Sequence, residues 1–164
     1  ELPFGRGKRY LNSGIASYIL GNWQWSNILG LYGGRPVNVV LGFDNANIGG
    51  SAQRPNLVGN PIPDEQTRER WINRAAFAAP APFTYGNAGR NVLRGPGRTN
   101  YDVALVKNMP LSEGTNLQFR GEFFNVLNTV NFGSPDANFS SNNFGVITSA
   151  GAARSIQFSL KLAF

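Results

Sequence analysis

Four charged residues lie in segments where apolar and polar side chains alternate, and they are the residues best placed to do chemistry. They are Asp102, Arg120, Glu122 and Lys161. Successive side chains of an extended chain point to opposite faces of a sheet, so all four are expected on the polar face of neighbouring strands. Opposite charges on adjacent strands would form a cross-strand charge ladder. The alternative is a direct part in the passage of protons or of a solute.

No other set of residues has a catalytic or metal-binding pattern. Cysteine and histidine are absent, which excludes thiol and imidazole catalysis and Cys/His zinc sites. Gly5–Lys8 is glycine-rich and basic, but it lacks the spacing of a phosphate-binding loop. Asp64, Glu65 and Glu69 lie where a helix is expected to begin, a position that suits carboxylates without any calcium ion. We therefore expect no catalytic residue, no cofactor, no metal and no enzyme activity.

The charged residues belong to segments with the two-residue period of β-strands. The clearest segment is 154–164, where large apolar residues alternate with small or polar ones up to a terminal aromatic. Strands are predicted near 154–164 and also near 20–32, 36–43, 99–109 and 116–127. Lys107 falls on the apolar face near a strand end, where it is expected to snorkel.

The lengths of the connections predict an asymmetric sheet. The turns at 33–36 and 110–115 are short, whereas the segments 5–19, 44–98 and 128–153 are long. Strict alternation of short and long connections collects the long loops at one end of an antiparallel sheet. The 44–98 loop is expected to hold a short helix, from a start at Asp64 to Ala79. The predicted fold is all-β: an antiparallel, up-and-down, barrel-type sheet of five or six strands.

The composition suits a β protein with many turns, and the asymmetry of the connections favours a membrane barrel. Charged residues make up 15% of the 164 residues, compared with about 25% in ordinary domains. The formal net charge of +6 comes mainly from scattered arginines, which suit solvated loops, outer-membrane lipid or lipopolysaccharide better than nucleic acid. No apolar run approaches the roughly 20 residues of a membrane helix. A soluble antiparallel barrel with one loop-rich end is the alternative.

Several motifs resemble the C-terminal barrel region of TonB-dependent outer-membrane receptors, closest to the Oar-like, Acidobacteria-type set with a carboxypeptidase-regulatory-like domain. The motifs are Phe77–Pro82, Tyr85–Gly97, Leu117–Asn128, Asn131–Gly133, Leu2–Arg9 and Trp23–Trp25. The resemblance implies that 1–164 is a single C-terminal barrel segment, and the start at Glu1 in mid-pattern suggests a piece of a longer protein. It also implies a terminal signal for the barrel-assembly machinery, formed by Phe158, Leu160, Leu162 and Phe164.

The function that the resemblance implies is uptake of a large solute across the bacterial outer membrane. Energised uptake would belong to the whole receptor, because the plug and the TonB box have no counterpart in these 164 residues. The expected partners are the remaining barrel strands or copies of the chain itself. The alternative function is structural: a processed barrel fragment would assemble outside the cell into an oligomer or filament, through pairing of edge strands.

Overall fold

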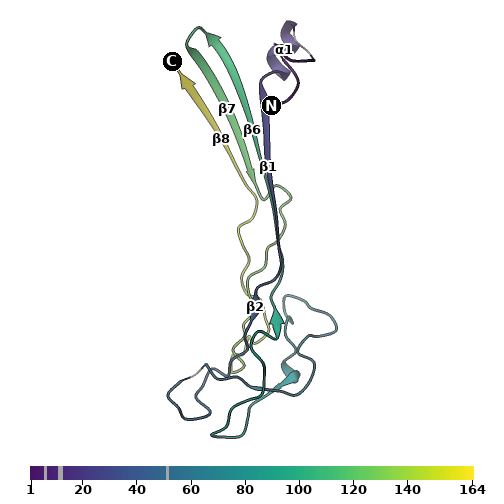
Figure 1. Ribbon diagram of the computed structural model, residues 1–164, viewed down its shortest axis with the longest axis vertical. Coiled ribbons are helices and arrows are strands. Elements are labelled where there is room, and N and C mark those ends of the chain that lie inside the picture. Colours follow the sequence, from purple (N-terminus) through teal and green to yellow (C-terminus); the bar gives the residue numbers. More distant parts are fainter. Residues whose placement is uncertain (6, 11–12, 51) are drawn as a thin grey trace. The chain divides into compact units, whose positions relative to one another are not determined.

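The computed structural model describes residues 1–5, 7–10, 13–50 and 52–164. The chain divides into two compact units, which are called here the sheet unit and the loop unit (Figure 1). The sheet unit comprises residues 1–31, 99–129 and 152–164, and the loop unit comprises 32–98 and 130–151. Each unit brings together segments that are far apart in the sequence, so each depends on long-range packing.

The sheet unit is built on four antiparallel strands in the order β1-β6-β7-β8. Their bounds are Trp23–Tyr32 for β1, Arg98–Ser112 for β6, Thr115–Phe124 for β7 and Ser155–Ala163 for β8. A tight turn joins β6 to β7, and longer segments join β1 to β6 and β7 to β8. The strands predicted near 20–32, 99–109, 116–127 and 154–164 are therefore present, and the mainly β, antiparallel fold class is confirmed.

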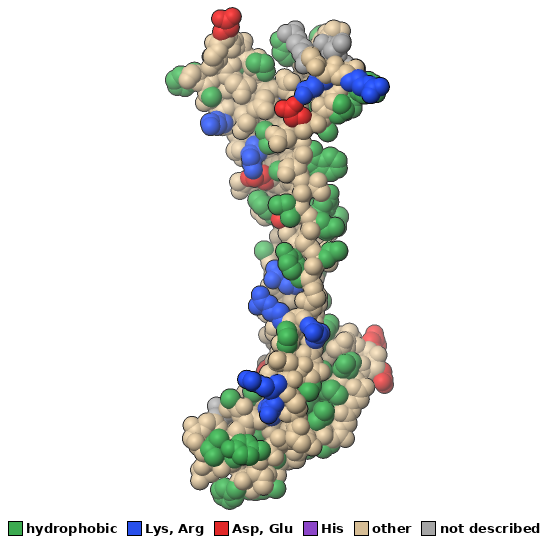
Figure 2. All heavy atoms as spheres, viewed as in Figure 1, with side chains coloured by type: hydrophobic (Ala, Val, Ile, Leu, Met, Phe, Trp, Pro, Cys, Tyr) green, Lys and Arg blue, Asp and Glu red, His purple; other side chains and the backbone are tan. Residues whose placement is uncertain are grey.

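The register gives the sheet one apolar face and one polar face. Each row across β6, β7 and β8 places three residues side by side. On the apolar face, one row is Leu105, Gly121 and Phe158, and the next is Lys107, Phe119 and Leu160. The polar face carries Asn108 opposite Gln118, and Glu122 opposite Gln157. Every residue of β8 is exposed on both faces, and Figure 2 shows hydrophobic side chains standing out along the sheet. Alternation therefore places the large apolar residues together, as the sequence predicted.

The prediction that a short turn at 33–36 joins strands near 20–32 and 36–43 is wrong. Only Pro36–Val37 (β2) is strand within 36–43, and it pairs with Leu93–Arg94 (β5) instead of β1. The alternation has another cause: Val37, Val39 and Leu41 are at most 6% exposed and belong to the buried interior of the loop unit. An extended segment packed on a core shows the same two-residue period as a strand that faces lipid.

The predicted position of the 5–19 segment is also wrong, because it depended on counting 33–36 as a short turn. The segment contains helix α1 (Gly14–Leu20). Gly21 N–H donates to Ser17 O at the end of α1, and Asn108 N–H near the β6–β7 turn donates to Asn22 O. Helix α1 therefore lies at the short-turn end of the sheet instead of the long-loop end. No described helix is long and apolar enough to cross a membrane.

The loop unit has its own hydrophobic core. Two small antiparallel pairs organise it, β2 with β5 and Asn56–Leu57 (β3) with Phe77–Ala78 (β4). The most buried side chains of the loop unit include Val39, Leu41, Ile72, Leu93 and Ile147. Edge-to-face ring contacts join Phe144 to Phe77 and to Phe139, at centroid distances of 5.8 and 5.6 Å. These long loops are therefore folded by burial of apolar surface.

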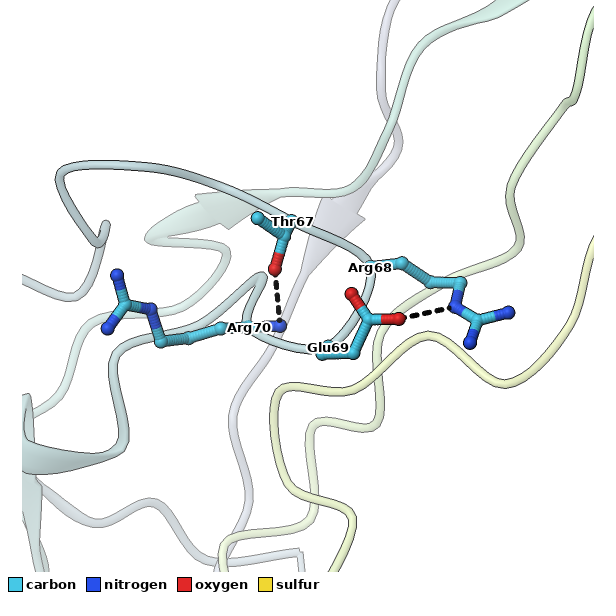
Figure 3. Close-up of polar contacts among 4 residues, drawn as sticks. All are labelled: Thr67, Arg68, Glu69 and Arg70. Atoms are coloured by element: carbon cyan, nitrogen blue, oxygen red, sulfur yellow. Dashed lines mark hydrogen bonds and ion pairs between the residues drawn. The ribbon is translucent and has the colours of Figure 1, made fainter.

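The helix expected between Asp64 and Ala79 is much shorter than predicted, because its backbone groups bond elsewhere. It is a single 3-10 turn, Arg74–Ala76 (η1). Trp71 N–H donates to Gly145 O, and Arg68 O accepts from Ile147 N–H, both at 2.8 Å. Upstream, Thr67 Oγ1 accepts from Arg70 N–H at 3.2 Å and Arg68 pairs with Glu69, in an exposed turn (Figure 3). Tertiary hydrogen bonds have thus replaced the helical ones.

Candidate functional site

The polar face of the sheet holds the four charged residues of the predicted ladder, but only two of them form an ion pair. Arg120 Nη2 lies 2.6 Å from Glu122 Oε1 along β7. The other oxygen, Glu122 Oε2, accepts from Gln157 Nε2 on β8 at 2.9 Å. The carboxylate therefore has a charged partner on its own strand, and its neutral partner Gln157 links it to the neighbouring strand.

The other two charged residues have different surroundings. Asp102 Oδ1 accepts a 2.8 Å hydrogen bond from the backbone N–H of Asn125, where the chain leaves β7. Lys161 lies opposite Gln118 on the polar face, and Gln118 Nε2 donates to Asn108 Oδ1 across β6 and β7. The arrangement can hold a hydrated, mixed-charge surface. Among the described residues, no group of three or more acidic side chains could hold a metal ion.

The apolar face carries a connected set of aromatic rings. Phe158 stacks on Phe119 at a centroid distance of 5.9 Å and meets Phe123 edge-to-face at 6.1 Å. Phe119 in turn meets Trp23 edge-to-face at 6.4 Å. Gly121 leaves room for the Phe158 ring, because a Cβ at that position would lie 3.2 Å from Phe158 Cε1. These contacts fix the rings relative to one another although one side of them is open.

The residues of the predicted terminal signal are all exposed. Phe158, Leu160 and Leu162 project from β8 with more than half of each side chain accessible, and Phe164 is 99% exposed beyond the strand end. Their common face follows from the register with β7, in which Leu160 pairs with Phe119 and Leu162 with Leu117. This arrangement leaves a complete strand edge and a terminal ring free to be contacted by another protein.

Lys107 has a structural role that the sequence did not reveal. It lies on the apolar face but is only 8% exposed. Its Nζ donates to the carbonyls of Tyr18, Ile19 and Gly21 at 2.7, 2.8 and 2.9 Å, and lies 5.1 Å from the Trp23 ring. These carbonyls belong to the C-terminal end of α1, where a cation interacts favourably with the unpaired backbone oxygens. Lys107 therefore anchors α1 to the apolar face instead of snorkelling.

Two asparagines organise the exit from β7, within the Leu117–Asn128 motif. Asn125 and Asn128 both have left-handed backbone conformations, with φ of 50° and 51°. The Asn125 side chain donates to Thr129 O and accepts from Thr129 N–H, both at 3.0 Å. Asn128 Oδ1 accepts from the N–H of Arg154, just before β8, at 3.1 Å. The motif therefore shapes the ends of two neighbouring strands.

The Asp44 carboxylate accepts several hydrogen bonds in the loop unit. It accepts from the backbone N–H groups of Ile48 at 3.1 Å and Gly49 at 2.7 Å, and from the side chain of Gln53. The Ile48 N–H, followed by the other two donors, lowers the pKa of Asp44, because each donor favours the ionised carboxylate. The turn after residue 44 is thus held by a negative charge.

Two sequence motifs carry little functional information. Gly5–Lys8 includes Arg6, which lies outside the described residues, and Lys8 pairs with Glu1. Asp64 and Glu65 are exposed in the loop unit, and the neighbouring Glu69 pairs with Arg68 at 3.0 Å (Figure 3). Each acidic side chain thus lies on the protein surface without a described cation site.

Comparison with known protein families gives a match over most of the chain. Residues 1–157 match the family described as "Outer membrane beta barrel domain". No curated protein and no solved structure matches the chain.

Proposed function

The chain belongs to the outer membrane beta barrel domain family, and from this premise we propose that it is part of a receptor-like barrel for solute uptake across the bacterial outer membrane. The observation that carries the proposal is the difference between the two faces of the β1-β6-β7-β8 sheet. One face presents exposed aromatic and aliphatic side chains, whereas the other presents amides and charged groups. A barrel wall between lipid and a hydrated lumen requires this difference.

The lengths of the strands support a membrane-spanning role. The strands β7 and β8 have 10 and 9 residues, and β6 has 15. A tilted strand of about 9–11 residues crosses the hydrocarbon core of a bilayer. The tight β6–β7 turn and the long segments at the opposite strand ends match the periplasmic turns and extracellular loops of bacterial barrels. We therefore assign the loop unit to the cell exterior.

Cysteine labelling tests the orientation of the faces, because the chain contains no cysteine. In isolated outer membranes that contain the protein, Q157C and S159C should react with a membrane-impermeant maleimide. The neighbouring F158C and L160C variants should react only after detergent is added, because lipid covers them. Equal labelling of all four positions, or labelling with the opposite period, would show that the sheet is not a barrel wall.

Uptake driven by TonB is the specific activity that the receptor-like motifs suggest. In this mechanism the loops capture a solute, a plug yields to TonB pulling, and the hydrated lumen conducts. The test compares four strains, with and without the gene and with and without TonB, by mass spectrometry of the spent medium. We expect a solute whose depletion requires both genes. Depletion that depends on this gene but not on TonB would indicate passive diffusion and would rule out the energised mechanism.

Self-assembly is the second candidate function, and the sheet edges favour it. The outer strands of the described sheet are β1 and β8, and β8 is exposed throughout. Open edges recruit further strands, whether these come from the rest of a barrel or from another copy. Electron micrographs of native material without detergent distinguish the two cases. Filaments or rings would support assembly, whereas a requirement for detergent and heat-modifiable gel mobility would support the membrane barrel.

A further inference from the structure

A cavity of about 360 Å³ lies within the loop unit. One wall comes from the segment that continues the β2–β5 pairing, where Gly95 N–H donates to Arg35 O at 2.8 Å. The other wall comes from two extended segments joined by hydrogen bonds from Gly133 N–H to Ser149 O and from Gly151 N–H to Asn131 O, at 2.8 and 2.7 Å. Both walls are therefore made of hydrogen-bonded backbone.

The first wall is closely packed. A Cβ on Gly34 would lie 1.8 Å from Gly95 O, so only glycine allows these two backbone segments to approach. The Gly34 carbonyl also accepts from Arg94 Nη1 at 3.2 Å. Together with the β2–β5 pairing, these contacts fix the backbone that carries Arg35. The cavity is consequently formed before any ligand arrives, which reduces the entropy lost on binding.

Two arginines line this cavity, and neither forms an ion pair with a carboxylate among the described residues. Arg35 and Arg98 both contribute to the lining. The ion pairs among the described residues involve Lys8, Arg68 and Arg120, but neither cavity arginine. The guanidinium of Arg98 lies over the Tyr32 ring, 6.0 Å from its centroid. Like charges at one site repel each other, and a bound anion would remove that repulsion.

The opposite wall supplies neutral polar groups. Asn131, Ser134 and Ser149 line the same cavity, together with backbone from Phe132 to Gly133. Hydroxyl and amide groups can donate to an oxyanion, while guanidinium groups bind carboxylate, sulfate or phosphate in a two-pronged fashion. The volume lies within the range of small-molecule sites, about 300–1,000 Å³. Charge, donors and size thus agree on one class of ligand.

We propose that the cavity between Arg35 and Arg98 binds the carboxylate, sulfate or phosphate group of a small solute, and that this anionic solute is what the barrel takes up. The inference rests on the proposed function, since it names the substrate class of the same receptor. The phosphate groups of lipopolysaccharide present the same chemistry from a second source. The experiment therefore uses soluble anions and lipopolysaccharide in separate arms.

Calorimetry on the purified, detergent-solubilised protein tests the site. The soluble probes are citrate and inorganic phosphate, and triethyl citrate is the uncharged match for citrate. Citrate or phosphate should bind, triethyl citrate should not, and R35Q and R98Q should each weaken binding about tenfold or more. R90Q is the matched control, because Arg90 is exposed in the same loop unit and does not line the cavity. It should bind like the wild type.

Each outcome has a definite meaning. If neither soluble anion binds, or if R90Q weakens binding as much as R35Q, the inference is wrong. Arginine-dependent binding that occurs only with lipopolysaccharide in micelles would replace the solute by a lipid and would also overturn it. The cysteine-labelling pattern is read independently on the same protein. Correct labelling without anion binding would overturn this inference alone, whereas anion binding without that pattern would overturn the barrel function.

Discussion

The exit from β7 gives the sharpest test of how the sequence holds the strands in register. Asn125 is 5% exposed and has a left-handed backbone with φ of 50°. Its side chain makes two 3.0 Å hydrogen bonds with Thr129 and a longer one, 3.4 Å, to Ala152 O. Both the backbone conformation and the side-chain contacts should therefore contribute to stability.

Replacing Asn125 by alanine removes both contributions. The two short hydrogen bonds are worth about 1 kcal/mol each, and the left-handed conformation costs an alanine roughly 1 kcal/mol or more. We expect Asn125→Ala to lower the free energy of unfolding by about 3 kcal/mol. Asn125→Gly loses the same hydrogen bonds but tolerates φ of 50°. The greater entropy of glycine in the unfolded state offsets part of this advantage. The free energy of unfolding should therefore fall by about 0.5–1 kcal/mol less for Asn125→Gly than for Asn125→Ala.

Urea unfolding of the protein folded in phospholipid vesicles measures these differences. Asn27→Ala is the control, because Asn27 is an exposed β1 residue and should change the unfolding free energy by less than about 0.5 kcal/mol. A loss for Asn125→Ala no larger than the control, or a larger loss for Asn125→Gly than for Asn125→Ala, would refute the reasoning.

Three further predictions concern other parts of the chain. Lys107→Met removes the cation from three carbonyls near the end of α1. Hydrogen exchange of the Gly14–Leu20 amides should accelerate about tenfold or more, whereas the amides of β7 and β8 should keep their protection. Unchanged exchange in α1 would contradict the anchoring role. The lowered pKa of Asp44 means that its ionised form stabilises the turn above its ordinary pKa and that this stability is lost as pH falls through the lowered value. The Ile48 and Gly49 amide resonances should therefore titrate below about pH 3.9, and the same titration in Asp44→Asn would show that another group is responsible. Deleting Phe164, which is 99% exposed, should leave the unfolding free energy unchanged but reduce the amount assembled in outer membranes several-fold; normal assembly would rule out a terminal signal.

The strands of the sheet could be predicted because their pattern is local. In β8, each large residue from Ile156 to Leu162 is separated from the next by one small or polar residue. Since successive side chains of a strand point to opposite faces, that pattern assigns both the secondary structure and the exposed apolar face. The same reasoning predicted β6 and β7. Along most of one face of this pair, an apolar residue of β6 lies opposite an apolar residue of β7.

The segment from Val37 to Leu41 shows where this reasoning fails. Val37, Val39 and Leu41 alternate with Asn38 and Val40, but these three residues are buried in the core of the loop unit. A two-residue period of apolar side chains indicates an extended backbone with one face removed from water. It does not indicate whether protein or lipid covers that face. Only long-range contacts, such as Val37 opposite Leu93, distinguish a buried segment from a strand that faces lipid.

Helix α1 could not be predicted for a different reason. Ser13 makes no capping hydrogen bond from its side chain, and the helix carries no charged residue in its first or last turn. A helix of 7 residues is marginal by itself. Its stabilising partner is Lys107, which is 86 or more residues away. The short helix therefore depends on tertiary structure, although Ser13 and Gly21 stand at its two ends, where such residues are common.

The strand register also decides which charged side chains lie opposite one another, and the register could not be predicted from the sequence. Asp102, Arg120, Glu122 and Lys161 all have the parity expected of the polar face. However, Glu122 faces Gln157, and Lys161 faces Gln118, four residues before Glu122 on β7. A shift of two residues between β7 and β8 would preserve both faces and would pair different side chains. Alternation thus predicts the face of each charge, whereas its partner depends on strand alignment.

The two cavity arginines are also brought together by tertiary structure, across a longer distance in the sequence. Arg35 and Arg98 are separated by more than sixty residues and have unremarkable neighbours, so no local motif identifies them. Backbone pairing brings their segments together, and the core around Leu41 and Ile72 gives the loop unit stability of its own. Removing one exposed guanidinium should therefore alter anion binding without unfolding that core. Lys107→Met provides the complementary case, because it should loosen α1 and leave anion binding unchanged.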